Sequence, residues 1–80
     1  MKAALINIGR RDICKTIDVS TSNPLEDAEK EVRRFCMSSN VWLSPIGESL
    51  KEFSVNAGMQ TVGKVEFSIE ITKEQLDRYL

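Results

Sequence analysis

The sequence predicts an α+β fold: a small antiparallel sheet with one main helix packed on one face and a short C-terminal helix. Apolar and polar residues alternate in segments 13–19, 51–57 and 64–71, which is typical of half-buried strands. The segment after Asn23 instead places apolar residues at helical spacing. The predicted order is β-β-α-β-β-β-α. With 80 residues in all, the chain has room for one domain, residues 1–80.

The first two strands are expected to form a hairpin. Residues 2–8 are largely apolar, and the turn sequence Gly9-Arg10-Arg11-Asp12 separates them from residues 13–19. Folding back about Arg10-Arg11 predicts three cross-strand pairs: Ile8 with Ile13, Ile6 with Lys15, and Ala4 with Ile17. This register would put the four isoleucines and Ala4 on one face, and a slip of one residue would break it.

The main helix carries the strongest local signals. Asn23 suits the N-cap, Pro24 the first helical position and Glu26 the acid of a capping box. Acidic residues fill the first turns and Arg33-Arg34 stand near the end, which matches the helix dipole. Ser38-Ser39-Asn40 is expected to close the helix. The expected buried stripe consists of Leu25, Ala28, Val32, Phe35 and Cys36.

Three further strands and a short helix are expected in the second half. Val41-Trp42-Leu43 reads as a short strand, and Pro45, which lacks an amide hydrogen, places it at an edge of the sheet or ends it. Residues 51–57 and 64–71 should form a hairpin around a loop bracketed by Gly58 and Gly63. The inward side chains of its second strand would be Val65, Phe67, Ile69 and Ile71. A capping box of Thr72 and Gln75 then starts a short helix with an apolar edge of Leu76, Tyr79 and Leu80.

Composition argues against several classes of protein. Eleven basic residues stand against twelve acidic ones, a balance that lacks the positive field of a non-specific nucleic-acid binder. No apolar run approaches the roughly 20 residues that cross a bilayer, so we expect no membrane association. The N-terminus does not resemble a signal peptide. We expect Cys14 and Cys36 to be reduced thiols and the protein to be cytoplasmic.

The residues needed for catalysis are scarce. The chain has no histidine, which removes the commonest general base and metal ligand. Two separated cysteines cannot form a four-thiolate zinc site. Glu66 and Glu70 share a strand face, but a solvated polar face is the simpler interpretation. We therefore expect no enzymatic activity, no catalytic residue, no metal and no cofactor.

Four residues are candidates for partner binding. Arg10 and Arg11 stand at the expected hairpin tip, where two guanidiniums could grip phosphates or an acidic protein surface. Arg33 and Arg34 would extend this patch only if the helix ends near the tip. Trp42 should point away from the inward Val41 and Leu43, on the face that Leu5 shares, unless the C-terminal helix covers it. Met59 lies in a loop where polar residues are expected, and exposed Trp and Met are typical of protein contacts.

The first functional hypothesis is a small protein-binding module, an inhibitor or regulator of a larger protein or complex. An edge strand near Pro45 would also offer strand addition. The order of elements is similar to that of small accessory proteins of phages and mobile elements; this likeness rests on topology and size and carries no residue across. The alternative is a nucleic-acid-binding regulator that uses the basic hairpin. An apolar face or edge strand would also serve a homodimer.

Overall fold

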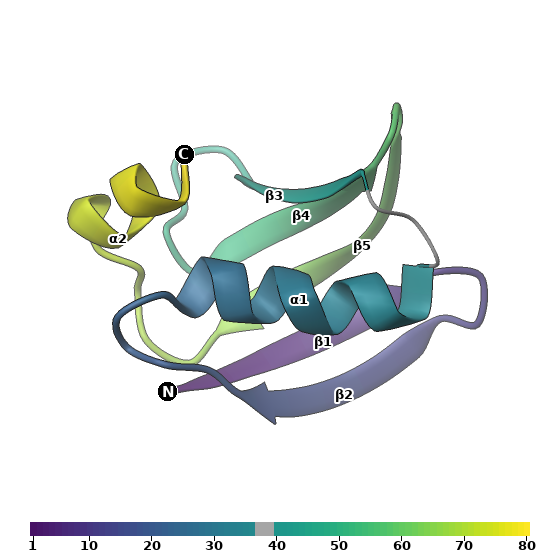
Figure 1. Cartoon of the computed structure of the whole chain (residues 1–80), viewed down its shortest axis with the longest axis horizontal. Helices are drawn as coiled ribbons and strands as arrows, with labels where there is room; N and C mark the ends of the chain where they lie inside the picture. The colour runs from purple at the N-terminus through teal and green to yellow at the C-terminus, as the bar shows by residue number, and fades with distance from the viewer. Residues whose placement is uncertain (37–39) are drawn as a thin grey trace.

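The computed structural model describes residues 1–36 and 40–80, so two residues of the expected helix closure, Ser38 and Ser39, lie outside the described residues. Five strands and two helices follow in the expected order (Figure 1). They are β1 (Lys2–Ile8), β2 (Ile13–Asp18), α1 (Pro24–Cys36), β3 (Val41–Pro45), β4 (Glu52–Ala57), β5 (Gln60–Phe67) and α2 (Lys73–Tyr79). The strands form one antiparallel sheet in the order β2-β1-β5-β4-β3. The predicted fold class is therefore confirmed, and Pro45 stands in an edge strand.

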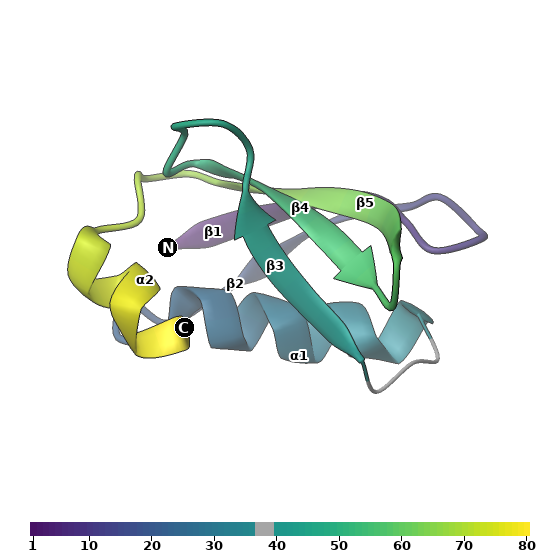
Figure 2. The same cartoon turned by 90° about the horizontal axis from the view of Figure 1, so that it is seen from above.

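Helix α1 packs on one face of this sheet, and the apolar core lies between them. Figure 2 shows α1 along that face, while no described element covers the other. Phe53 of β4 and Phe67 of the neighbouring β5 are fully buried. Their ring centroids lie 5.5 Å apart in an edge-to-face arrangement. The core is completed by Ala3, Leu5, Ile8, Val19, Leu25, Ala28, Val32, Val41, Leu43, Val55, Val65 and Ile71.

The predicted register of the first hairpin is only partly right. Ile8 pairs with Ile13 as expected, but Leu5, not Ile6, pairs with Lys15. Ala3, not Ala4, pairs with Ile17. A bulge between Leu5 and Ile8, where Asn7 has φ of 52°, inserts the extra residue that shifts the alternation. Leu5 consequently faces α1 and is buried, so it does not share a face with Trp42.

The second hairpin has a shorter turn than the glycines suggested. Ala57 pairs with Gln60, which leaves Gly58 and Met59 as the turn, and β5 begins at Gln60. Gly58 has φ of 62° at the first turn position, where a two-residue hairpin favours glycine. The strand ends at Phe67, so Ile69 lies beyond it and is exposed, contrary to the expectation that it points inward.

The start of α1 is held by a carboxylate other than the expected one. The amide of Ser20 donates to the Asp27 carboxylate over 2.8 Å, and the amide of Asp27 donates to the carbonyl of Asn23. Asn23 directly precedes the helix and Pro24 occupies its first position, as predicted. Hydrogen bonds from Ser20 lower the pKa of the Asp27 carboxyl, because they stabilise its charged form.

We expect this carboxylate to add stability that disappears in acid. Because its pKa is lower in the folded chain, the contribution is present above the ordinary value of about 3.9 and is lost as pH falls through the folded value. Urea unfolding of the native chain and of Asp27→Asn, followed between about pH 6 and about pH 2, checks this. The variant should lose less stability over that range. Asp77→Asn, at an exposed carboxylate of α2, is the control, and an equal loss in all three chains would contradict the assignment.

Helix α2 docks against α1 and the edge of β3. Thr72 and Gln75 form the predicted capping box, and Arg78 donates to the carbonyl of Ser22 over 2.9 Å. Leu76 and Tyr79 pack against the core, but Leu80 is exposed, contrary to expectation. Over the described residues, neither helix is long and apolar enough to cross a membrane.

Tyr79 connects both helices to the sheet. Its hydroxyl accepts the amide hydrogen of Leu43 over 2.8 Å and donates to the Glu29 carboxylate of α1. Two positions on the free edge of β3 therefore have no amide hydrogen to offer: Leu43 donates to Tyr79, and Pro45 has none. This makes β3 poorly suited to the strand addition considered from the sequence.

A pH titration of the Tyr79 hydroxyl should reveal its partly buried position between the two helices and the sheet. Burial, with the carboxylate of Glu29 beside it, raises the pKa of Tyr79 well above its usual value near 10. Tyr79 is the sole tyrosine of the chain, so the ultraviolet absorbance of tyrosinate reports on it alone. In the folded chain, tyrosinate should form only well above about pH 10, together with loss of structure. In the urea-unfolded chain, it should form near about pH 10. Ionisation near the urea value with the fold intact would contradict this.

Candidate functional site

The path of the chain gathers two turns and a helix end at one end of the molecule. Strand β1 runs to the turn at residues 9–12, β2 runs back, and α1 returns toward that turn (Figure 1). Strand β3 then runs away from this end and β4 runs back to it, so the turn at Gly58 and Met59 lies at this end too. We call the surface formed by residues 9–13, 34–36 and 57–63 the arginine end.

Close backbone contacts join these three segments. The amide of Gly9 donates to the carbonyl of Val62 over 2.9 Å, which ties the first turn to the second hairpin. A Cβ on Gly9 would lie 3.0 Å from the carbonyl oxygen of Phe35, so the turn touches the end of α1. Gly63 is equally close to the bulge of β1, where the Asn7 carbonyl oxygen would lie 2.9 Å from an added Cβ. The arginine end is thus a packed assembly.

A hollow of about 930 Å³ opens between the three segments. Three arginines line it: Arg10 and Arg11 from the first turn and Arg34 from the last turn of α1. The other described residues of the lining are Asn7, Gly9, Asp12, Ile13, Phe35, Cys36, Ala57, Gln60, Thr61, Val62 and Gly63. The condition that the sequence left open, a helix end beside the hairpin tip, is therefore met for Arg34.

The guanidiniums differ in how they are paired. Arg33 lies 2.9 Å from Glu29, and Arg34 lies 3.5 Å from Glu31. Among residues 1–36 and 40–80, no carboxylate lies within ion-pair distance of Arg10 or Arg11, and both side chains are exposed. The lining contains one acid, Asp12, against three arginines. The hollow therefore carries an excess of positive charge in a chain whose net charge is -1.

Met59 lies in the turn of the second hairpin and is not among the described residues that line this hollow. It is the second residue of the β4–β5 turn and is fully exposed, and Gln60 and Thr61, which follow it, line the hollow. Three of the four residues singled out from the sequence, Arg10, Arg11 and Met59, therefore lie at the arginine end. An exposed thioether is suited to apolar contact with a partner protein.

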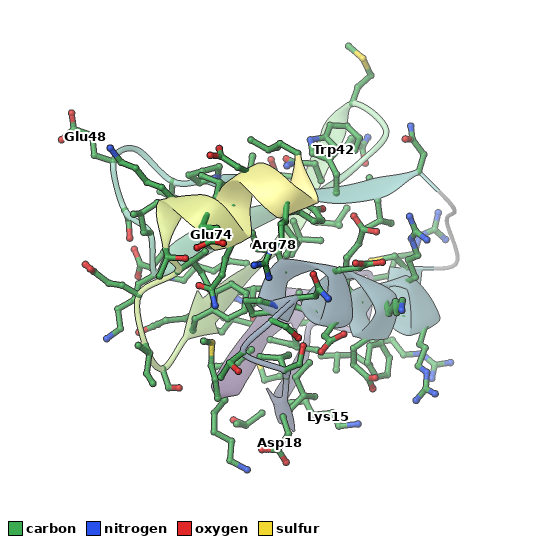
Figure 3. All side chains as sticks on the ribbon, turned by 60° about the vertical axis from the view of Figure 1, so that its left-hand side comes forward. Lys15, Asp18, Trp42, Glu48, Glu74 and Arg78 are labelled. Atoms are coloured by element: carbon green, nitrogen blue, oxygen red, sulfur yellow. The ribbon has the colours of Figure 1, made fainter. Side chains whose placement is uncertain are left out.

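Trp42 occupies a different place. It pairs with Asn56 on the face of the sheet opposite α1, and 40% of its surface is exposed. It also borders a smaller hollow of about 450 Å³ with Leu43, Arg78, Tyr79 and Leu80. Figure 3 shows Trp42 beyond α2 and Arg78 beside Glu74. The C-terminal helix therefore approaches Trp42 without covering it. Trp42 points outward, which is one placement expected from the sequence, and it also borders the C-terminal helix, which is part of the other.

The open sheet face also carries the partly buried Ala4 and Ile6 of β1, and its polar groups near Trp42 are largely paired with one another. The hydroxyls of Ser44 and Ser54 lie 2.8 Å apart, and Asn56 donates to Ser44 over 3.0 Å. Lys64 lies 3.0 Å from Glu52 on neighbouring strands. Trp42 thus has neutral hydrogen-bonded groups beside it on the sheet and the charged Glu26, Glu29 and Arg78 around the smaller hollow. By contrast, Arg10 and Arg11, which are unpaired in the part of the chain that the structure describes, are at the arginine end.

The two cysteines are free thiols. Cys14 is exposed, and its sulfur lies 3.5 Å from the side chain of Asn7. Cys36 is half-buried at the end of α1, where burial raises the pKa of its thiol. Within the described ranges, no group of three or more potential metal ligands comes together.

Sequence reasoning missed the second hairpin's contribution to the hollow. The sequence pattern predicts a loop at Gln60, Thr61 and Val62, whereas their position in the lining with the arginines depends on the two-residue turn. Phe35 and Ile13 were assigned wholly to the core, yet both also line the hollow. The order of elements held a signal for the position of Phe35: a helix that follows a hairpin and runs antiparallel to its second strand ends near the hairpin's turn.

Searches of protein families, characterised proteins and solved structures found no match for this chain.

Proposed function

We propose that this chain is a non-enzymatic protein-binding module that inhibits or regulates a larger protein, and that it binds an acidic surface of that partner through the arginine end. The observation that supports this most is the pair Arg10 and Arg11, exposed and unpaired among the described residues, at the rim of a hollow shared with Arg34. Guanidinium groups form bidentate hydrogen bonds with carboxylates and phosphates, and they are enriched at protein interfaces.

Met59 supplies the apolar part of this surface. Interfaces usually combine a few large anchors with a polar rim. Met59 is fully exposed and adjoins residues that line the hollow. We place Trp42 at a secondary contact, because it lies on the open face near the same hairpin but outside the hollow. The free thiols of Cys14 and Cys36 support a cytoplasmic location.

The test is capture of partners from a lysate of the source organism. Immobilised wild-type chain is compared with Arg10→Gln/Arg11→Gln, Met59→Ala and Trp42→Ala. Lys51→Gln/Lys73→Gln is the matched control, because it also removes two exposed positive charges, at the opposite end of the molecule. A specific partner should be retained by wild type and control, lost with the arginine variant and weakened with Met59→Ala. Equal recovery by all chains would contradict the proposal.

A nucleic-acid-binding regulator is the second candidate, and the convergence of three arginines on one hollow is what favours it. Contact with about three phosphates predicts a slope of about -2.7 for duplex DNA, and of about -2.1 for a single strand, when the logarithm of the binding constant is plotted against the logarithm of salt concentration. Titration with single-stranded and duplex oligonucleotides checks this. The protein-binding proposal expects no measurable binding at low salt.

A further inference from the structure

The hollow at the arginine end has two chemically distinct parts. Three of its described lining residues, Arg10, Arg11 and Arg34, supply its positive charge, and Arg34 shares its charge with Glu31. Five of its described lining residues are apolar and incompletely buried, and each packs against the core on its other side: Ile13, Phe35, Cys36, Ala57 and Val62. A ligand that uses both parts must carry an anionic group attached to an apolar body.

The arginines suit a phosphate monoester better than a carboxylate. A monoester carries a charge of about -1.5 to -2 near neutral pH and presents three acceptor oxygens. A carboxylate carries one negative charge and two acceptor oxygens, so it offers less charge and fewer acceptors to three guanidiniums than a phosphate monoester does. Here two adjacent arginines have no acid partner among the described residues, and Arg34 lies 3.5 Å from its acid.

The apolar lining suits an aromatic ester. A phosphate on a short aliphatic chain, as in phosphoserine, would leave most of this lining in contact with water. An aromatic ring would cover it, and burial of apolar surface is favourable. The volume of about 930 Å³ accommodates a ring with its phosphate and adjoining peptide.

The distribution of charge favours a single phosphate over a nucleic-acid strand. A strand presents evenly spaced phosphodiesters and needs basic groups spread along a track. The unpaired guanidiniums here are adjacent residues at one turn, and the open sheet face carries paired charges such as Lys64 with Glu52. We infer that the hollow binds a phosphotyrosine side chain of the partner protein, an inference that rests on the proposed function.

The first experiment uses small probes and the full chain. Nuclear magnetic resonance titrations with phenyl phosphate, inorganic phosphate and phenol should show phenyl phosphate binding at least about tenfold more tightly than either other probe. The largest shifts should fall on amides of residues 9–13 and 57–63. Equal affinity for phenyl phosphate and inorganic phosphate would overturn the inference, and so would shifts elsewhere.

Variants separate the two parts of the hollow. Arg10→Gln/Arg11→Gln should weaken phenyl phosphate more than about tenfold, and the Lys51→Gln/Lys73→Gln control should not. Val62→Ala shortens the apolar lining, so it should weaken phenyl phosphate while leaving inorganic phosphate unchanged. Amide spectra of each variant establish that it is folded. Unchanged binding by a folded arginine variant would overturn the inference.

Peptides then identify the source of the phosphate. A phosphotyrosyl peptide should bind, whereas the phosphoseryl and unphosphorylated versions should bind at least about tenfold more weakly. Tighter binding of an oligonucleotide would overturn the inference in favour of nucleic acid. If no phosphorylated probe binds while partner capture still depends on Arg10 and Arg11, this inference fails and the proposed function stands. If capture is also independent of the arginines, both fail.

Discussion

Replacing Gly63 by alanine is expected to lower the free energy of unfolding by about 3 kcal/mol, as overpacking and backbone strain act together. An added Cβ would lie 2.6 Å from Cδ1 of Ile8 and 2.9 Å from the carbonyl oxygen of Asn7. The residue also has φ of 152°, which side chains other than that of glycine rarely adopt. The neighbours cannot withdraw easily, because the Asn7 carbonyl is backbone and Ile8 is buried. Urea unfolding measures the effect.

Gly58 provides the matched control. It also has a positive φ, of 62°, but nothing lies within 4 Å of an added Cβ. Gly58→Ala should therefore lose only the backbone component, about 1 kcal/mol. Equal losses for the two variants would show that the contact between β5 and the bulge of β1 is unimportant. A larger loss at Gly63 would support the close packing that joins the first turn to the second hairpin.

Truncating Phe53 to alanine is expected to cost about 3–5 kcal/mol, the range for large aromatic side chains in cores. Phe53 is fully buried, and its ring meets that of Phe67 edge to face at 86°. A domain of this size has a total stability of about 4–12 kcal/mol. Phe53→Ala should therefore lose a large part of this stability and unfold at a markedly lower temperature than the native chain, as measured by circular dichroism during heating.

A milder variant keeps this prediction measurable. Phe53→Leu retains most of the buried volume and should remain folded with a loss of about 1–2 kcal/mol. A double-mutant cycle with Phe67→Leu should give a coupling of about 0.5–1.5 kcal/mol for the aromatic pair. A fully folded Phe53→Ala chain with unchanged stability would contradict the position of Phe53 in the core.

Local signals predicted most of the elements, because each depended on residues close together in the chain. The capping box of Thr72 and Gln75, the start of α1 at Pro24 and the edge position of Pro45 follow from backbone chemistry that acts over a few residues. The registers that failed depended on contacts between distant segments. The bulge at Asn7 forms where β1 lies beside Gly63 of β5, a residue more than fifty positions further along the chain.

The candidate site shows the same division. Arg10, Arg11 and Met59 were identified from their residue types and expected exposure, and the structure places them at one end. Their common location followed from the direction of each strand, since both hairpin turns and the end of α1 lie at the same end of the sheet. The hollow itself could not be foreseen. It depends on the two-residue turn and on the approach of Gly9 to Phe35.

The edges of the sheet affect how a partner can approach. Tyr79 and Pro45 close two positions of β3, whereas β2 forms the other edge, where Lys15 and Asp18 are labelled in Figure 3. Charged residues on an exposed edge discourage unspecific strand pairing. Recognition through the arginine end needs no added strand, because it uses turns and a helix end.

Amide chemical shifts of the isotope-labelled chain, recorded with and without the captured partner, test binding through the arginine end most directly. The strongest changes should cluster at residues 9–13, 34–36 and 57–63, the three segments that surround the hollow. Changes confined to the open sheet face around Trp42, or to the free edge of β2, would show that the partner binds elsewhere and that the arginines have no part in recognition.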